Sequence, residues 1–224
     1  MERHFVQELE NLKTQVVRMG SMVEQSVELS IKSLLERREE LARQVLSQEE
    51  RVNAFEIEID NAVVDLLALQ QPVASDLRFI LAAMKINNDL ERIGDHAVNI
   101  AESAISCAAR PTLNVKLELP RMGVVTQTML KDTLDGFIHK DAAVCRAVLQ
   151  NDDVIDELNK RIFMDLENVI RSDPSTIEQA LDLIRVSRNL ERIADLTTNI
   201  AEEVIFVAEA QVVKHHIEKR TPGR

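Results

Sequence analysis

Apolar residues recur at helical spacing along most of the chain. Within roughly 60° of Ile93 on a helical wheel lie the apolar residues Ile86, Leu90, Ala97, Ile100 and Ala104. A stripe of this width is typical of a helix that buries one face. The same pattern predicts long helices over residues 4–36, 39–70, 73–108, 120–138, 141–172 and 174–216.

Turn residues mark most of the helix ends. Asp173-Pro174 has the order of an N-cap followed by a first helical position. Gly136 and residues 139–141 indicate a turn, whereas residues 35–40 contain no Gly, Pro, Asn, Asp or Ser. Residues 5–70 could therefore form one unbroken helix, but by analogy with 139–141 we predict a break near residues 37–39.

The chain contains an internal repeat. Residues 89–102 (DLERIGDHAVNIAE) and 189–202 (NLERIADLTTNIAE) agree at nine of 14 positions at an offset of 100. Upstream, Met19-Gly20 matches Met122-Gly123 at an offset of 103, so one connection differs by three residues. A repeat of about 100 residues has the size of a domain rather than of a solenoid unit.

The sequence thus predicts an all-α fold of two tandem repeats, each an antiparallel three-helix bundle. We expect a first bundle over residues 1–110, a linker over 111–119, a second bundle over 120–216 and a flexible tail over 217–224. The linker falls in the segment RPTLNVKLELP, which interrupts the helical pattern.

Composition excludes several classes. Only 5 of 224 residues are Gly and 5 are Pro, too few for a fold of many short strands, and no glycines are spaced for a dinucleotide fingerprint or a P-loop. The net charge of −11 argues against nucleic-acid binding. The sequence has no signal-peptide core, no apolar run of 18 residues, and two cysteines without metal-ligand spacing. We therefore expect a cytoplasmic protein.

Opposite the apolar stripe, residues 84–104 carry a row of acids. Glu91, Asp95 and Glu102 lie within roughly 20° of the pole opposite Ile93. The second repeat has Glu191, Asp195 and Glu202 at the same places, and Asn99 and Asn199 lie beside the two rows. The second helices supply the further acids Glu56, Asp60, Asp152 and Asp156.

Two interpretations of these faces remain open. A charged row opposite a core stripe is commonly a solvated face, with Arg92 and Arg192 pairing with Asp95 and Asp195. Like charges at i,i+4 nevertheless destabilise a helix, and both repeats keep them. A bound cation would remove that penalty, since carboxylates are hard oxygen ligands for Mg²⁺, Mn²⁺, Ca²⁺ or iron.

A row of basic residues runs beside each acidic face. Lys85 and Arg92 correspond to Arg185 and Arg192, seven residues apart in each repeat. They could attract phosphate or the acids of a partner. The alternative is that they form salt bridges at the edge of the core.

Three features of the sequence carry a family resemblance. They are the two copies of ERI[GA]D-x-x-x-N-I-A-E, the segment Met19-Gly20-Ser-Met-Val-Glu-Gln-Ser-Val, and the segment Gln71-Pro-Val-Ala-Ser-Asp-Leu-Arg78. Nearly the whole chain, up to about residue 210, resembles the PhoU family of phosphate-signalling proteins. The resemblance implies two tandem three-helix bundles, often dimeric, with multinuclear metal sites on the Glu-x-x-x-Asp faces.

The same resemblance implies a regulator rather than an enzyme. Its partners would be the cytoplasmic components of the phosphate ABC transporter and a phosphate-sensing histidine kinase, with the membrane reached only through them. The implied metal ligands are Glu91, Asp95, Glu191 and Asp195, and the secondary candidates are Asn99, Glu102, Asn199, Glu202, Glu56 and Asp60. The metal itself (Fe, Mn, Mg, Zn or Ca) is left open.

Two other functions remain as alternatives. A metal-dependent phosphohydrolase would need a general base beside the carboxylates, and His96 is the candidate, although its counterpart is Leu196. A structural helical adaptor would need no metal at all.

Overall fold

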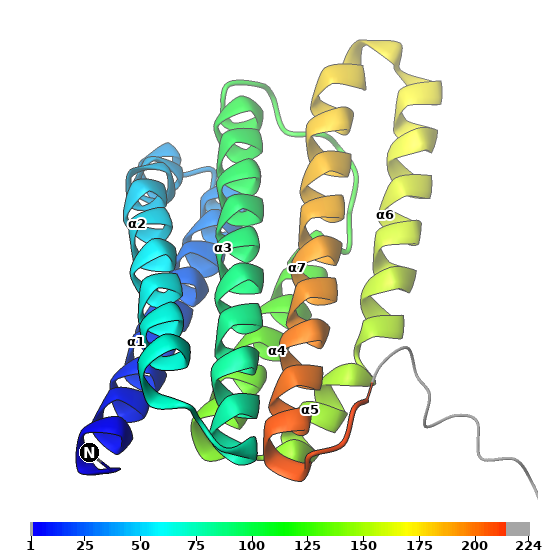
Figure 1. Cartoon of the computed structure of the whole chain (residues 1–224). Coiled ribbons are helices and arrows are strands. Elements are labelled where there is room, and N and C mark those ends of the chain that lie inside the picture. Colours follow the sequence, from blue (N-terminus) through cyan, green and yellow to red (C-terminus); the bar gives the residue numbers. More distant parts are fainter. Residues whose placement is uncertain (1, 214–224) are drawn as a thin grey trace, which may run out of the picture.

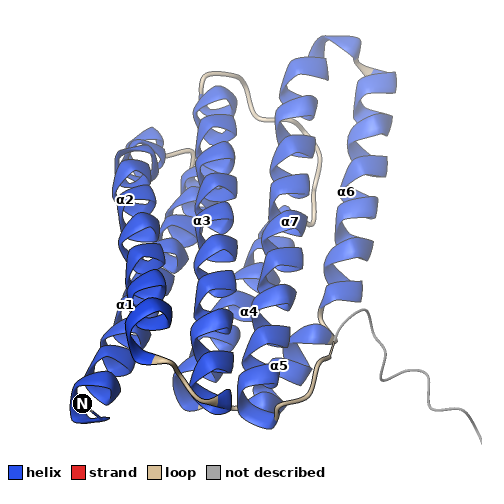
Figure 2. Cartoon of the chain, viewed as in Figure 1, coloured by secondary structure: helices blue, strands red, loops and turns tan. Residues whose placement is uncertain are grey.

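The computed structural model describes residues 2–213, and within them every regular element is helical (Figures 1 and 2). The first bundle consists of α1 (Glu2–Glu36), α2 (Glu39–Gln70) and α3 (Ala74–Ala108). The second consists of α4 (Leu119–His139), α5 (Ala142–Leu149), α6 (Asp152–Ser172), the short 3₁₀ helix η1 (Pro174–Thr176) and α7 (Ile177–Glu209). The all-α fold of two tandem helical bundles is therefore confirmed.

The break between the first two helices lies where the repeat predicts it. Arg37 has a φ of 55°, and at an offset of 103 Lys140 also has a φ of 55°. The left-handed conformation ends each helix although neither residue is glycine. The Arg37 guanidinium donates to the carbonyls of Ala108 (3.0 Å) and Arg110, which ties this corner to the end of α3.

The predicted helix over residues 141–172 is wrong in one respect, because it is divided into α5 and α6. The Gln150 and Asn151 N–H groups donate to Ala147 and Val148 in tight i→i+3 bonds that end α5. The equivalent residues of α2 are Ser47 and Gln48, and α2 continues through them. Asn favours turns and caps whereas Gln is a good helix former, which favours a break at Asn151.

The other ends agree with the prediction to within a few residues, except at the C-terminus. Asp173 caps η1 by accepting from the Ser175 N–H at 3.0 Å, with Pro174 at the first position. The last helix was predicted to reach residue 216, but α7 ends at Glu209 and Ala210 has a φ of 56°. The predicted tail over 217–224 lies outside the described residues.

The two bundles pack through matched elements. Helices α3 and α7 run antiparallel at the centre of the molecule (Figure 1), where Lys85 contacts Glu203 and Ser106 contacts Asp182. Behind them α1 crosses α4. A Cβ on Gly20 would lie 2.6 Å from Leu134 Cδ2, and one on Gly123 would lie 2.9 Å from Ile31 Cγ2.

This crossing is reciprocal. At an offset of 103, Gly123 is the counterpart of Gly20 and Leu134 is the counterpart of Ile31. Each repeat therefore places a glycine beneath a large aliphatic side chain of the other repeat. The repeats are thus related by an approximate twofold axis. That relation explains why Met-Gly recurs in the sequence.

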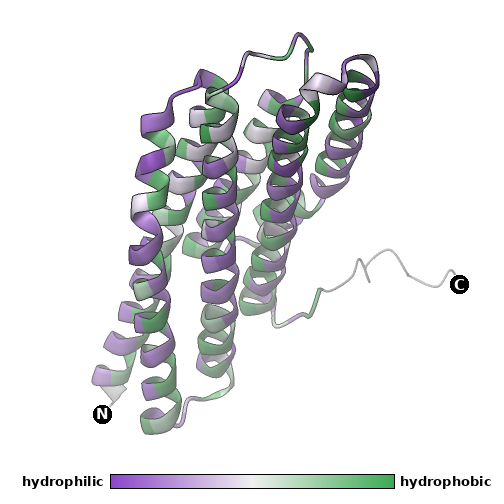
Figure 3. Cartoon of the chain, turned by 90° about the horizontal axis from the view of Figure 1, so that it is seen from above, coloured by the Kyte–Doolittle hydropathy of each residue, from purple (hydrophilic) through white to green (hydrophobic). Residues whose placement is uncertain are grey.

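Each helix presents a hydrophobic side to the interior and a hydrophilic side outward (Figure 3). The core is aliphatic and joins both bundles, with Leu12, Met19, Ile93, Met122 and Ile193 fully buried or nearly so. In the described part of the chain, no helix combines the length and the apolar character that crossing a bilayer requires.

Candidate functional site: two acidic faces and a groove between the repeats

The predicted acidic face of the first repeat is present on α3 and α2. Glu91 is half-buried, and its pKa is raised by burial and by the nearby charges of Asp95 and Glu56. Arg92 opposes this shift. The structure therefore brings Glu56 to the Glu91–Asp95 pair from the neighbouring helix, as the sequence suggested.

The second repeat has an equivalent face on α7 and α6. The pKa of Glu191 is raised by burial and by Asp195, with Asp156 adding to the rise. The pKa of Asp156 is likewise raised by burial and then by Asp195. The acid from the second helix is Asp156 here and Glu56 in the first repeat. The two lie one helical turn apart when α2 and α6 are aligned at an offset of 103, so the two faces differ in detail.

The donor chemistry of both faces suits a hard cation, because each gathers carboxylates that repel one another. Within residues 2–213, however, no three His, Cys, Asp or Glu side chains stand close enough together to hold a metal ion. A cation would have to draw the partly exposed carboxylates inward. The metal therefore stays a prediction, with Glu91, Asp95 and Glu56 as one ligand set and Glu191, Asp195 and Asp156 as the other.

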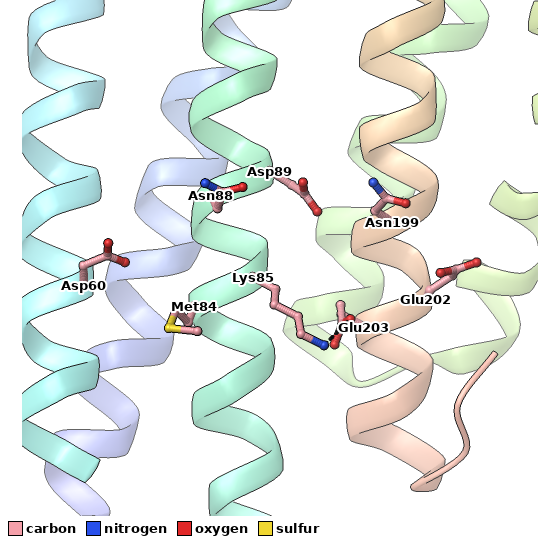
Figure 4. A pocket seen from close by; sticks show the side chains of 8 residues that line it. All are labelled: Asp60, Met84, Lys85, Asn88, Asp89, Asn199, Glu202 and Glu203. Atoms are coloured by element: carbon pink, nitrogen blue, oxygen red, sulfur yellow. Dashed lines mark hydrogen bonds and ion pairs between the residues drawn. The ribbon is translucent and has the colours of Figure 1, made fainter. Parts of the chain in front are cut away.

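Three of the secondary candidates are found elsewhere. Glu202 lies eleven residues beyond Glu191, roughly 16 Å along the helix, so the two cannot share one ion. Glu202, Asn199 and Asp60 instead line a groove across α2, α3 and α7 (Figure 4). Asn99 and Glu102 occupy the equivalent positions at the opposite end of the α3–α7 contact.

The groove encloses about 500 Å³. Its lining residues come from both repeats and are Asp60, Met84, Lys85, Asn88, Asp89, Asn199, Glu202 and Glu203. Four carboxylates and one ammonium give it a net charge of −3. Lys85 Nζ donates to Glu203 Oε1 at 2.7 Å across the gap between α3 and α7. We call this site the seam groove.

After Glu203, Asp89 is the most buried acid of the seam groove, and 9% of the residue is exposed. Figure 4 shows its side chain directed from α3 toward α7. Burial raises its pKa to about 6, against the opposing charge of Arg92. The Arg92 Nη1 is 3.7 Å from Asp89 Oδ1, beyond hydrogen-bonding distance.

The predicted basic rows are engaged with acids. Lys85 pairs with Glu203, Arg185 lies 3.5 Å from Asp182, and Arg192 donates to Asp195 at 3.0 Å. The Arg192–Asp195 pair is the one expected from spacing, whereas Arg92 lies near Asp89 instead of Asp95. These contacts fit salt bridging at the core edge better than a free phosphate-attracting surface.

The seam groove was missed by sequence reasoning. Asp89, Glu203 and Asn88 were not singled out, because a helical wheel drawn for one repeat does not show which face meets the other repeat. A signal was present nevertheless. Asp89 and Glu203 are acids whose counterparts, Asn189 and Ser103, are neutral, so the repeat departs from itself there.

Known proteins resemble this chain over nearly its whole length. The family model described as "PhoU domain" matches it twice, over residues 16–104 and 119–204. A "Phosphate-specific transport system accessory protein PhoU homolog" of Clostridium acetobutylicum is 36% identical over 93% of this chain and 96% of its own length. A protein of the same description from Aquifex aeolicus is also 36% identical, over 95% of this chain and 97% of its own length.

Solved structures agree with these matches. The crystal structure of PhoU from Pseudomonas aeruginosa superposes with a TM-score of 0.90 at 35% identity, covering 92% of this chain and all of that one. The crystal structure of the phosphate transport system regulatory protein PhoU from Streptococcus pneumoniae superposes with a TM-score of 0.87 at 26% identity. The match covers 94% of this chain and all of that one. Two copies of the domain, the matched ERI[GA]D helices and the shared architecture together place this chain in the PhoU family.

Proposed function

We propose that this protein is a cytoplasmic regulator of phosphate homeostasis that restrains high-affinity phosphate uptake and holds the phosphate-responsive sensor kinase in its non-signalling state. The observation that supports the proposal most is the nearly full-length similarity to proteins named as accessory or regulatory components of phosphate transport. The acidic faces and the seam groove would dock basic surfaces of the transporter's cytoplasmic components and of the kinase. A homodimer is part of this proposal.

The metal would bind at the two acidic faces. Glu91 and Asp95 with Glu56 would hold one site, and Glu191 and Asp195 with Asp156 the other. A divalent cation or iron would neutralise carboxylates whose pKa values are already raised by burial and by mutual repulsion. It would also hold the mutually repelling carboxylates in fixed positions, so that groups of a partner can bind there.

We propose an adaptor rather than an enzyme. His96, the candidate general base, lies in the contact between the repeats, where its Nδ1 is 2.8 Å from Asn189 Oδ1. A base held there is turned toward the other repeat instead of toward the carboxylates of its own face. This geometry does not favour the phosphohydrolase alternative.

Deletion of the gene tests the regulatory proposal. In phosphate-rich medium the deletion strain should express phosphate-starvation genes and take up phosphate without restraint, and a plasmid copy should restore repression. Silent starvation genes together with normal uptake in the deletion strain would refute the proposal.

Metal content tests the second part. The purified protein should carry a divalent metal or iron, and the variant Glu91→Gln, Asp95→Asn, Glu191→Gln, Asp195→Asn should have lost it. The matched control is Glu102→Gln, which removes an acid of the same helix about eleven residues from the Glu91 face. Equal metal in the wild type and the fourfold variant would reject these ligands.

A further inference from the structure

The arginine of each ERI[GA]D motif has a possible partner three residues before it and another three residues after it on the same helix. In the first repeat these are Asp89 and Asp95, and residues three positions apart are neighbours on a helix surface. Arg92 takes the earlier one, with Nη1 3.7 Å from Asp89 Oδ1. Within residues 2–213, no ion pair joins Arg92 to Asp95 or to Glu91.

The arginine of the second repeat takes the later partner. The residue three positions before it is Asn189, which is neutral where Asp89 is an acid. Arg192 is therefore turned toward its own acidic face. Its Nη1 donates to Asp195 Oδ2 at 3.0 Å, and its Nε lies 3.7 Å from Glu191 Oε2. Both carboxylates that the motif offers to a cation are thus in contact with one guanidinium.

The other basic side chains nearby are held by other acids. Lys85 Nζ donates to Glu203 Oε1 at 2.7 Å across the gap between α3 and α7. Its counterpart Arg185 lies 3.5 Å from Asp182 Oδ1. The contrast between the two acidic faces therefore depends on where the motif arginines point, and that follows from the residue three positions before each of them.

We propose that Asp89 is a positioning residue for the acidic face of the first repeat. Asp89 is directed toward α7 (Figure 4), and by holding Arg92 it leaves the carboxylates of Glu91 and Asp95 open to a cation. The second face has no such residue, so a cation there must first displace Arg192. This inference rests on the metal sites of the proposed function and makes them unequal, because the first face binds the cation more tightly.

The expected difference in affinity is modest, because the competing pair lies at the surface. The side chains of Arg192 and Asp195 are 56% and 37% exposed. Breaking an exposed ion pair of this kind costs about a fivefold change in binding at most. The tests therefore compare matched variants of the two repeats in the same measurement.

Binding of Mn²⁺ to the full-length protein is followed by the loss of the free-ion electron paramagnetic resonance signal. The double variant Glu191→Gln, Asp195→Asn retains the first face alone, and Glu91→Gln, Asp95→Asn retains the second face alone. The first face should bind Mn²⁺ about fivefold more tightly than the second. Equal affinities of the two faces would contradict the proposal.

The two motif arginines give a matched pair of further variants, because both are exposed and occupy equivalent positions. Arg192→Gln, in the protein that retains the second face, should strengthen Mn²⁺ binding about fivefold because it removes the competing guanidinium. Arg92→Gln, in the protein that retains the first face, should change binding by less than about twofold. The proposal is wrong if the two substitutions have the same effect.

Asp89→Asn, in the protein that retains the first face, tests the positioning role itself. It should weaken Mn²⁺ binding about fivefold, because Arg92 is then free to pair with Asp95. Adding Arg92→Gln should restore the binding. If binding stays weak in that combined variant, the lost charge of Asp89 acts on the cation directly and the positioning role is rejected.

A crystal structure of the metal-free Asp89→Asn protein gives a readout that needs no cation. Arg92 should lie within hydrogen-bonding distance of Asp95, as Arg192 does of Asp195. An Arg92 side chain that still points away from Asp95 would overturn the proposal.

These outcomes separate the inference from the proposed function. If Mn²⁺ binds but the two faces and the two arginine variants behave alike, the inference fails alone. If Mn²⁺ binds to neither the wild type nor any variant, the metal part of the proposed function fails and the inference fails with it. Deletion of the gene reads out the regulatory function independently of both.

Discussion

The two places where the repeats meet differ in how well they preserve the twofold relation. Where α1 crosses α4, the contacts are the same in both directions, with Gly20 beneath Leu134 and Gly123 beneath Ile31. Where α3 meets α7, one end is a groove of net charge −3 and the equivalent positions at the other end carry +1. The packing of α1 against α4 follows the twofold relation, whereas the charges at the two ends of the α3–α7 contact do not.

This difference separates stability from function. A close helix crossing leaves little choice of residue, because any added atom meets a packed neighbour. The rim of α3 and α7 is exposed to solvent, so its residues can diverge without unfolding the protein. Burial raises the pKa of Asp89 to about 6, and a titratable group shifted in this way marks a candidate functional site.

The largest effect is expected at the symmetric crossing. Gly20→Val and Gly123→Val should each lower the free energy of unfolding by about 1–3 kcal/mol, because a branched side chain must displace Leu134 or Ile31. Denaturant unfolding followed by circular dichroism measures both. If the reciprocal packing is correct, the two losses are similar, and a large loss in only one would break the symmetry.

A smaller effect of opposite sign is expected at the asymmetric end. Asp89→Asn should raise the free energy of unfolding by about 1–2 kcal/mol at pH 8, since it removes the charge of a buried carboxylate. The pKa of Asp89 is about 6 in the folded protein against a usual 3.8, so the native state binds the proton more tightly. The cost of the charge is absent below pH 4, grows between pH 4 and 6, and is complete above that.

The measurement for Asp89→Asn is unfolding in urea at pH 4.5 and pH 8, beside the wild type. The gain should be larger at pH 8 than at pH 4.5. A gain that is equal at both pH values would show that the charge of Asp89 is not what costs stability.

The smallest effect is expected inside the family motif. Gly94→Ala should change the free energy of unfolding by less than about 1 kcal/mol, in the stabilising direction, because alanine is the better helix former. A Cβ there would lie 3.4 Å from Val52 Cγ1, an ordinary contact, and the second repeat already has Ala194. Thermal unfolding checks this, and a strong loss would mean that the two motif helices are packed differently.

Local signals in the sequence were enough for the helices and the acidic faces. Helical spacing around Ile93 and the offset repeat predict the bundles, and the repeat also locates the break at Arg37, where no turn residue stands. The division of α5 from α6 depends on Asn151 and Asp152 stopping a helix that Gln48 and Glu49 continue, a choice of a few tenths of a kcal/mol per residue.

The seam groove could not be predicted in the same way. Its residues come from α2, α3 and α7, so Asp60, Lys85 and Glu203 become neighbours only after the repeats dock. The wheel placed Glu102 with Glu91, and Glu202 with Glu191, because it shows direction and ignores distance along the axis. Only a comparison of Asp89 with Asn189 and of Glu203 with Ser103 points to a functional difference between the ends.

The most direct test of the account is a phosphate-starvation reporter in phosphate-rich medium, in strains that carry full-length variants in place of the wild-type gene. The deletion strain sets the derepressed level. We expect Asp89→Asn, Glu202→Gln to approach that level at normal protein abundance, and Glu102→Gln, its mirror at the other end, to stay repressed. Equal repression by the two variants would contradict the claim that the seam groove is one of the surfaces through which the protein regulates its partners.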